Sequence, residues 1–304
     1  GDITILDDEL DGDAIDALEE ERDALSDDAL RARLLEDDPE QAPFKMEVPI
    51  RQLLSYGIGV MMGRYRLGHD GLHIAHPEPT REERAPYDVP MPLCAPAPNT
   101  TEQFAIDDDG IVPLMGTDSP FSDDAVYRMQ EIVKLIWGED MLTETLNFIN
   151  RALSVGRSRG LKRSYEKTME EWLVGDFYDY HKKLYSVPYY GKKPIYWLFQ
   201  SPEGHFQVLV YMHRMTKYTA RQVRSYLNTY QQHVRREKEA LEDQGEDTLS
   251  GSMAKRLDRL RAAEEDCRAY GDILQNVAEK QIEIDLDDGV QNNYPLFGDA
   301  LAAL

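Results

Sequence analysis

The chain has 304 residues, and its 34 Lys and Arg against 57 Asp and Glu give a formal net charge of −23. Hydrophobic residues make up 41% and charged residues 30%, which is typical of a globular protein with a core. No apolar run approaches the roughly 20 residues that cross a membrane, and two cysteines, Cys94 and Cys267, are too few for a disulfide framework or a zinc ribbon. With no visible signal peptide, we expect a cytoplasmic protein with no membrane partner.

The charge is unevenly distributed along the chain. Residues 1–40 hold 17 acids and 3 bases, whereas residues 151–240 hold 17 bases and 8 acids. A basic stretch inside an acidic chain predicts a surface for a polyanion. Pairing of those bases with acidic segments of the same fold is the open alternative.

In chain order, the acidic residues 1–46 are predicted to form a helical or linker segment, and residues 47–67 an apolar helix. Gly57, Gly59 and Gly63 resemble a nucleotide-binding loop. Such a loop needs a preceding strand, and here apolar residues continue at helical period through the glycines. We therefore predict glycines that permit close helix packing. The proline-rich residues 77–120 predict a long loop with one short strand at 103–106.

The next elements alternate between helices and a hairpin. Ser122, Asp123 and Asp124 predict the cap of a helix ending near residue 137. Further helices are predicted over 139–153 and 168–185, on either side of the basic loop 156–167. Residues 193–213 predict a β-hairpin with its turn at 201–204. Two long helices, from 216 or 219 to 242 and from 252 to 279, predict an antiparallel helical hairpin. The predicted class is α+β, predominantly α-helical.

Catalytic and metal-binding patterns are weak in this sequence. It has no nucleophile elbow, P-loop or H-E-x-x-H motif. His69, His73 and His76 lack a cysteine or carboxylate at a familiar spacing, so hydrogen-bonded histidines are favoured over a metal cluster. The DLDDG string at 285–289 resembles a calcium loop without its later bidentate acid, and a polar turn is favoured. We predict no catalytic and no metal-binding residues.

The hairpin aromatics have two interpretations. Base stacking would need exposed rings. Alternation along the strand makes both faces apolar, which favours a hairpin buried between helices. The residues concerned are Tyr196, Trp197, Phe199, Phe206 and Tyr211.

Four blocks together carry a family resemblance. They are PIRQLLSYGIGVMMGRYRLGHDGLHIAHP, FAIDDDGIVPL, KKPIYWLFQSPEGHFQVLVYMHRMT and IEIDLDDGVQNNYPLFGDAL, in that order. From about residue 48 to the end, the chain resembles the C-terminal half of the PglX-type adenine-specific DNA methyltransferases of BREX phage-defence systems, relatives of the type IIG restriction–modification methylases. The resemblance implies a prokaryotic protein. After the segment 1–46, it implies a target-recognition-like domain at 47–214 and a helical hairpin with a C-terminal tail at 215–304.

The resemblance also implies what lies elsewhere in such enzymes. Their N-terminal domain binds S-adenosylmethionine through a glycine-rich motif and acts through an Asn-Pro-Pro-Tyr motif, and neither occurs here. The string Asn292-Asn293-Tyr294-Pro295 has a different order. We therefore expect no cofactor in this chain and no methyl transfer by it alone. It is either an excised region or a separately encoded specificity-type subunit, with double-stranded DNA and the catalytic domain or other defence-system subunits as partners.

Basic residues are the predicted DNA contacts, because recognition domains position themselves on phosphates and read bases with Arg. They lie in the basic loop, at the mouth of the hairpin and around the start of the following helix. They are Arg157, Arg159, Lys162, Arg163, Lys192, Lys193, Arg214, Lys217, Arg221 and Arg224, with Arg64 and Arg66 as second-rank candidates. For each one alone, solvation or a surface ion pair is the alternative.

Three other functions remain open. The helical hairpin and acidic N-terminus would serve an assembly module of the defence complex without DNA affinity. The overall charge would suit an inhibitor that resembles DNA, although the basic centre does not. An independent enzyme would need catalytic residues brought together from distant parts of the chain.

Overall fold

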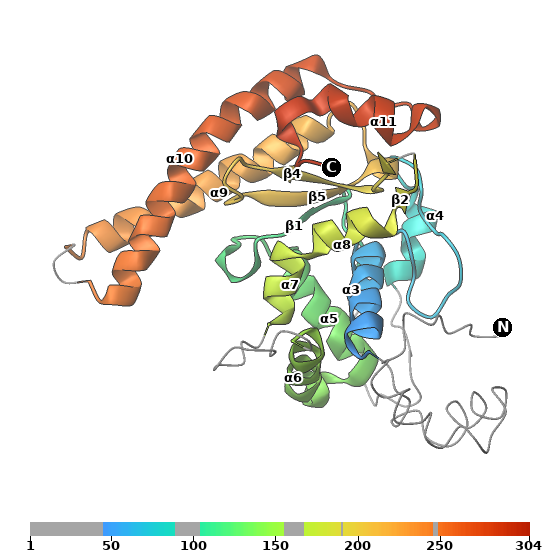
Figure 1. Cartoon of the computed structure of the whole chain (residues 1–304), viewed down its shortest axis with the longest axis horizontal. Helices are drawn as coiled ribbons and strands as arrows, with labels where there is room; N and C mark the ends of the chain where they lie inside the picture. Colours follow the sequence, from blue (N-terminus) through green and yellow to red (C-terminus); the bar gives the residue numbers. More distant parts are fainter. Residues whose placement is uncertain (1–44, 89–103, 155–166, 190, 246–248) are drawn as a thin grey trace. The chain divides into compact units, whose positions relative to one another are not determined.

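The computed structural model describes residues 45–88, 104–154, 167–189, 191–245 and 249–304. Helices dominate, and the strands form small antiparallel sheets (Figure 1), so the predicted α+β, predominantly helical class is confirmed. Within these ranges, every helix is too short or too polar to cross a membrane.

The described residues divide into two compact units. Residues 45–53, 148–154 and 167–168 belong to the first, and the described parts of 54–147 and 169–304 to the second. The predicted division into 1–46, 47–214 and 215–304 stays a prediction.

The helices follow the predicted order. They are α3 (Glu47–Met61), α4 (Arg81–Arg84), α5 (Ala125–Trp137), α6 (Leu142–Leu153), α7 (Met169–Gly175), α8 (Phe177–Leu184), α9 (Thr219–Glu242), α10 (Gly251–Lys280) and α11 (Gly289–Asn293). Asp124 caps α5 by accepting a hydrogen bond from the Val126 amide at 3.0 Å, as its sequence predicts. The single helix predicted over 168–185 is two helices, α7 and α8, interrupted at Asp176.

The main sheet has the strand order β1-β5-β4, with β1 (Ile111–Pro113), β4 (Tyr196–Gln200) and β5 (Gln207–Tyr211) all antiparallel. The predicted hairpin is β4–β5 and is confirmed. The strand predicted at 103–106 is wrong: residues 104–106 lie outside any strand, and the third strand begins at Ile111. Asp107 turns the chain between them, because its carboxylate accepts three backbone hydrogen bonds, from Asp109, Gly110 and Ile111.

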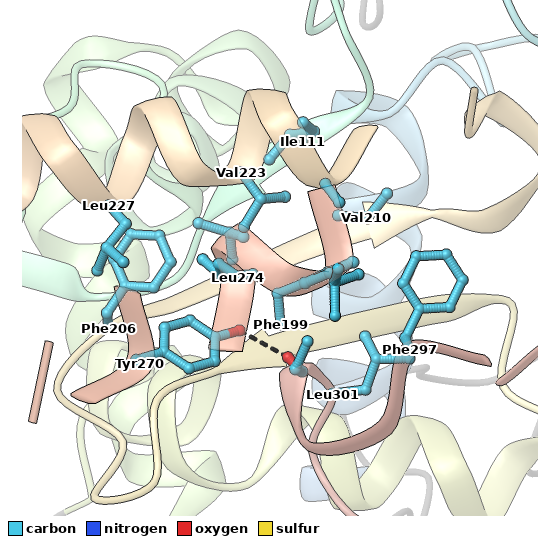
Figure 2. Close-up of a cluster of buried hydrophobic side chains, with 14 of the residues drawn as sticks. Ile111, Phe199, Phe206, Val210, Val223, Leu227, Tyr270, Leu274, Phe297 and Leu301 are labelled. Atoms are coloured by element: carbon cyan, nitrogen blue, oxygen red, sulfur yellow. Dashed lines mark hydrogen bonds between the residues drawn. The ribbon is translucent and has the colours of Figure 1, made fainter. Parts of the chain in front are cut away.

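Helices cover both faces of the β4–β5 hairpin. On one face, its aromatic and aliphatic side chains join a large buried cluster with α9, α10 and the residues after α11 (Figure 2). On the other face, the ring of Tyr196 stacks on His181 of α8 with centroids 4.6 Å apart. The hairpin aromatics Tyr196, Trp197, Phe199, Phe206 and Tyr211 are all at most 1% exposed, so the core interpretation is confirmed over base stacking.

The helices α9 and α10 form the predicted antiparallel pair. Ion pairs cross between them, linking Lys238 to Glu264 at 2.6 Å, Arg256 to Glu237 at 2.6 Å and Arg261 to Glu242 at 2.9 Å. These pairs neutralise cations of the helical hairpin with acids of the same hairpin.

The last residues of the chain run beside the main sheet. Leu301 forms an antiparallel bridge with Phe199 of β4, and the Ala302 amide donates to the Leu198 carbonyl at 2.9 Å. The Tyr270 hydroxyl of α10 donates to the Ala300 carbonyl at 2.6 Å (Figure 2). This terminal segment is therefore part of the core.

The glycines of α3 permit close packing, as predicted. A Cβ at Gly57 would lie 2.7 Å from the Met129 sulfur of α5, and one at Gly59 would overlap the Tyr65 ring. Because α3 runs through Gly57 and Gly59 as a helix, these two glycines do not form a nucleotide loop.

The described part of the first unit fixes the two ends of the basic loop. The Lys167 amide donates to the Ser154 hydroxyl at 2.7 Å, and that hydroxyl donates to the Asn150 carbonyl at 2.6 Å. The chain therefore leaves at Ser154 and re-enters beside it at Lys167.

Candidate nucleic-acid interface

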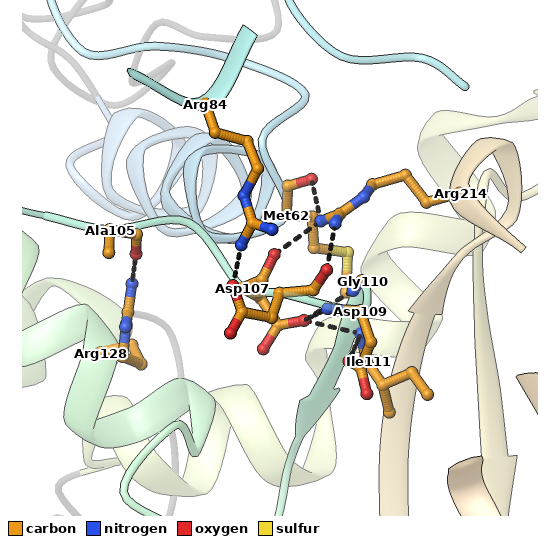
Figure 3. A network of polar contacts seen from close by, with 10 residues as sticks. Met62, Arg84, Ala105, Asp107, Asp109, Gly110, Ile111, Arg128 and Arg214 are labelled. Carbon is orange, nitrogen blue, oxygen red and sulfur yellow. Dashed lines mark hydrogen bonds and ion pairs between the residues drawn. The ribbon is translucent and has the colours of Figure 1, made fainter. Parts of the chain in front are cut away.

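The loop before β1 is held by Arg214, which the sequence predicts as a DNA contact. Its guanidinium donates to the carbonyls of Met62, Asp107 and Asp108 at 3.3, 2.8 and 2.8 Å (Figure 3). Arg214 is 4% exposed, and burial lowers its pKa. Because the guanidinium is bound to backbone carbonyls inside the fold, Arg214 is poorly placed for a DNA contact, and we leave it out of the interface that we propose.

Carboxylates accompany Arg214 in this network. Burial, with Asp107 beside it, raises the pKa of Asp109 to about 8. The neighbouring Asp108 pairs with Arg84 (Figure 3). A cavity of about 460 Å³ beside this pair is lined by Arg81, Arg84 and Asp108, together with Pro79 and Ala105. Its mixed charge does not favour a polyanion, so we place the interface elsewhere.

Four predicted contacts lie outside the described residues. They are Arg157, Arg159, Lys162 and Arg163 of the basic loop, and they stay a prediction. The described residues on either side of them, Ser154 and Lys167, are joined by a hydrogen bond.

A basic patch lies at the start of α9. The Lys217 ammonium and the Arg221 guanidinium sit 5.4 and 5.6 Å from the centroid of the Tyr218 ring, which is 46% exposed. Both cations are exposed, and neither has an ion-pair partner among the described residues. We call Lys217, Tyr218 and Arg221 the α9 patch. Arg224, one turn further on, is half-buried.

Lys192 and Lys193 belong to a second, smaller hairpin. Strands β2 (Ser186–Val187) and β3 (Gly191–Lys192) pair antiparallel, and Lys192 is exposed. Lys193 is half-buried, and its amide donates to the Tyr185 carbonyl at 2.8 Å.

The second-rank candidates Arg64 and Arg66 are both partly buried. The Arg64 guanidinium donates to the Tyr185 hydroxyl at 2.6 Å and lies 4.8 Å from the Tyr65 ring centroid. Arg64 therefore supports the base of the small hairpin. The Arg66 carbonyl accepts a hydrogen bond from Tyr56 at 3.1 Å.

Sequence reasoning missed two tyrosines. Tyr218 lies between the two cations of the α9 patch, and Tyr189 is fully exposed in the turn of the small hairpin. A signal was present for the second one, because the string KKLYSVPYYGKK places lysine pairs at both ends of an aromatic turn.

The histidines and the DLDDG string have local structural partners. His76 lies 2.8 Å from the Glu83 carboxylate, and His69 and His73 contact each other edge to face. The Asp285 carboxylate accepts a hydrogen bond from the Asp287 amide, which is the polar turn favoured from the sequence. Across the described ranges, no group of three or more His, Cys, Asp or Glu is placed to hold a metal ion.

Comparison with known proteins finds no matching family model. The chain is, however, similar to two proteins. Over 264 residues the chain is 38% identical to "Adenine-specific methyltransferase BrxX" of Escherichia coli O9:H4 (strain HS), which covers 83% of this chain and 20% of that protein. Over 251 residues it is 29% identical to "Adenine-specific methyltransferase PglX" of Lacticaseibacillus casei (strain Zhang), covering 81% of this chain and 19% of that protein. The chain thus spans about a fifth of the length of the relatives it matches.

Proposed function

Because this chain is homologous to a part of the adenine-specific methyltransferases BrxX and PglX, we propose that it is a region that binds double-stranded DNA and recognises the target sequence. Methyl transfer, and the S-adenosylmethionine that it consumes, then belong to the catalytic part of such an enzyme. In this proposal the chain works inside a prokaryotic phage-defence complex.

The observation that carries the proposal is the α9 patch. Its two cations are exposed on a chain whose net charge is −23, and no described acid pairs with either of them. Three bases of the α9–α10 pair behave differently, because Lys238, Arg256 and Arg261 are bound to acids across the hairpin. Pairing within the fold therefore accounts for part of the basic stretch and leaves the α9 patch free for phosphates. The Tyr218 ring, which both cations contact and which is 46% exposed, adds aromatic surface against which a sugar or base can pack.

Fluorescence anisotropy with a mixed-sequence duplex at two salt concentrations tests the proposal. The double variant Lys217→Glu/Arg221→Glu is expected to lower the affinity by about tenfold or more at low salt. The salt dependence, log Kd against log salt, should flatten by about two because each phosphate contact contributes roughly 0.9. Lys255→Glu/Arg259→Glu is the matched control: it makes the same charge change, at the same spacing, on exposed residues at the start of α10.

Two outcomes would contradict the proposal. Equal loss in both variants would mean that net charge alone governs binding and that the α9 patch is not the interface. Absence of binding by the unmodified chain at low salt would reject self-sufficient DNA binding. The affinity would then belong to the complete methyltransferase complex.

The alternative is an assembly module without its own DNA affinity. The observation that favours it is the acidic segment 1–40, with 17 acids and 3 bases. Deleting this segment and measuring co-purification with the catalytic part and other defence subunits distinguishes the two. Loss of a partner together with unchanged DNA binding would assign docking to the segment and DNA recognition to the remainder.

A further inference from the structure

The small hairpin β2–β3 lies in a basic segment of the second unit. Residues 182–193 contain four lysines and no acid, in a chain of net charge −23. Lys182 is occupied, because its ammonium contacts the Asp179 carboxylate at 2.8 Å and the Ala303 carbonyl at 2.9 Å. Lys183 and Lys192 are exposed and have no described acid within ion-pair distance, although with Lys182 they help to lower the pKa of the nearby Asp179. Two exposed lysines therefore flank the hairpin.

The turn of this hairpin presents an aromatic ring to solvent. Tyr189 is fully exposed, and Val187 on the adjoining strand is 45% exposed. A large exposed aromatic residue contributes no burial to the stability of the fold. Its position therefore calls for another explanation.

The backbone conformation of Tyr189 also indicates a role other than folding. Its φ is +67°, in the left-handed region that a bulky residue rarely adopts outside strained turns. Glycine relieves such a conformation without cost, and Gly191 already takes a positive φ two residues later. Residues held in strained conformations cluster at binding and catalytic sites. The hairpin thus keeps a tyrosine where folding alone would favour glycine.

The base of the hairpin is held firmly. The Lys193 amide donates to the Tyr185 carbonyl at 2.8 Å, and the Tyr185 hydroxyl accepts from Arg64 at 2.6 Å. The Tyr185 ring also packs against His181, which is fully buried, with centroids 4.8 Å apart. A tip on such a base needs little further ordering when it binds.

We propose that the β2–β3 hairpin enters a groove of duplex DNA, with Tyr189 packed against a base step and Lys183 and Lys192 on flanking phosphates. The inference rests on the proposed function and names the element that would contact the DNA bases. Exposed lysines beside an exposed aromatic ring match a polyanion whose bases stack, whereas an acidic protein partner would not require the ring. A two-stranded ribbon has dimensions that the major groove accepts, and apolar wedges part base steps in the minor groove.

Duplexes carrying 2-aminopurine test this directly, since the probe brightens when its stacking is disturbed. We expect the full chain to raise the probe's fluorescence at one or a few positions, and Tyr189→Phe to retain the rise. Tyr189→Ala and Tyr189→Gly should abolish it and weaken binding severalfold. Trp137→Ala, which removes a 43% exposed aromatic residue from the end of α5, is the control.

Thermal unfolding distinguishes a structural role from a binding role. Tyr189→Gly relieves the positive φ, so its Tm should be unchanged or higher while its DNA binding falls. The inference would be overturned if Tyr189→Gly and Tyr189→Phe both lowered the Tm and the DNA affinity together. It would also be overturned if the unmodified chain bound DNA and Tyr189→Ala changed neither the fluorescence nor the affinity. No DNA binding by the unmodified chain would overturn the proposed function and this inference with it.

Discussion

The carboxylate of Asp266, on α10, accepts a hydrogen bond from the Ser201 hydroxyl at 2.6 Å. Both residues are buried, and 65 positions separate them in the chain. The same carboxylate accepts from the amides of Glu203 and His205 at 3.0 and 3.3 Å. One side chain of the helical hairpin therefore fixes the turn of the β4–β5 hairpin. The strand pair and the helix pair are locked in one register by this contact.

Replacing Asp266 is expected to destabilise the fold strongly. Asp266→Ala leaves a buried hydroxyl and two amides without their acceptor, which costs about 2–4 kcal/mol of unfolding free energy. Urea denaturation gives the value from the shift in midpoint. Asp258→Asn, at an exposed position of the same helix, is the control and should change the midpoint little. Equal midpoints for Asp266→Ala and the unmodified chain would show that the turn does not depend on α10.

The sequence predicted the elements that depend on local signals. The cap at Asp124, the turn at 201–204 and the long helices were all readable, because each depends on neighbouring residues. The role of Asp266 in holding the turn could not be predicted from the sequence, since its three hydrogen-bond partners lie more than 60 residues away. The strand at 103–106 failed for a related reason: Asp107 sets the turn, and only the pairing with β5 decides where the strand begins.

Gly59 is expected to tolerate no side chain. A Cβ there would overlap the Tyr65 ring and approach the buried Tyr196 hydroxyl to 3.1 Å. Gly59→Ala should lower the unfolding free energy by about 1–3 kcal/mol through overpacking. Gly251→Ala, where a Cβ meets nothing within 4 Å, is the matched control and should leave the Tm nearly unchanged. Thermal unfolding followed by far-UV circular dichroism measures both, and equal Tm values would contradict the packing argument.

Asp109 should make stability fall as pH rises toward 8. Burial, assisted by Asp107, raises its pKa to about 8, so the folded protein keeps a proton that the unfolded chain releases near pH 4. Over this window the folded state binds more protons, and unfolding free energy declines by at most about 1.4 kcal/mol per pH unit. Asp109→Asn keeps an oxygen for the Ile111 amide and should flatten the decline.

The measurement is cleanest above pH 6.5. Below that value His181 acts in the opposite sense, because burial lowers its pKa to about 3 and stability rises with pH from about 3 to 6.5. His76 acts in the same sense as Asp109 above pH 6.5, since hydrogen bonds to Pro77 and Glu83 raise its pKa. The comparison of Asp109→Asn with an exposed control, Asp70→Asn, therefore isolates the effect. Parallel pH profiles for the two variants would reject it.

The basic loop offers a prediction that comes from the sequence alone. Reversing Arg157, Arg159, Lys162 and Arg163 to Glu should abolish duplex binding, because four phosphate contacts would be replaced by repulsion. Fluorescence anisotropy at low salt measures the effect, and the Lys255→Glu/Arg259→Glu variant shows how much loss two charge reversals, half the number, cause on exposed residues of α10. Unchanged binding would remove the loop from the interface and leave the α9 patch and the small hairpin.

The candidate interface was predictable only in part. The sequence locates basic residues, but it does not tell an exposed cation from one that is buried and hydrogen-bonded inside the fold. Arg214 and Lys217 are three positions apart, yet the first serves backbone carbonyls inside the fold and the second lies exposed beside Tyr218. Burial and hydrogen-bond partners separate them, and both follow from contacts with distant segments such as Asp107.

The terminal segment beside β4 has a consequence for self-association. An unpaired strand edge is a template for a strand of another molecule. Leu301 and Ala302 occupy the outer edge of β4, and at the opposite edge Pro113 of β1 has no amide hydrogen to offer. Among the described residues, both edges of this small sheet are thus protected against intermolecular β-pairing. Removing residues 299–304 would expose the edge of β4, and concentration-dependent aggregation would then accompany any loss of stability.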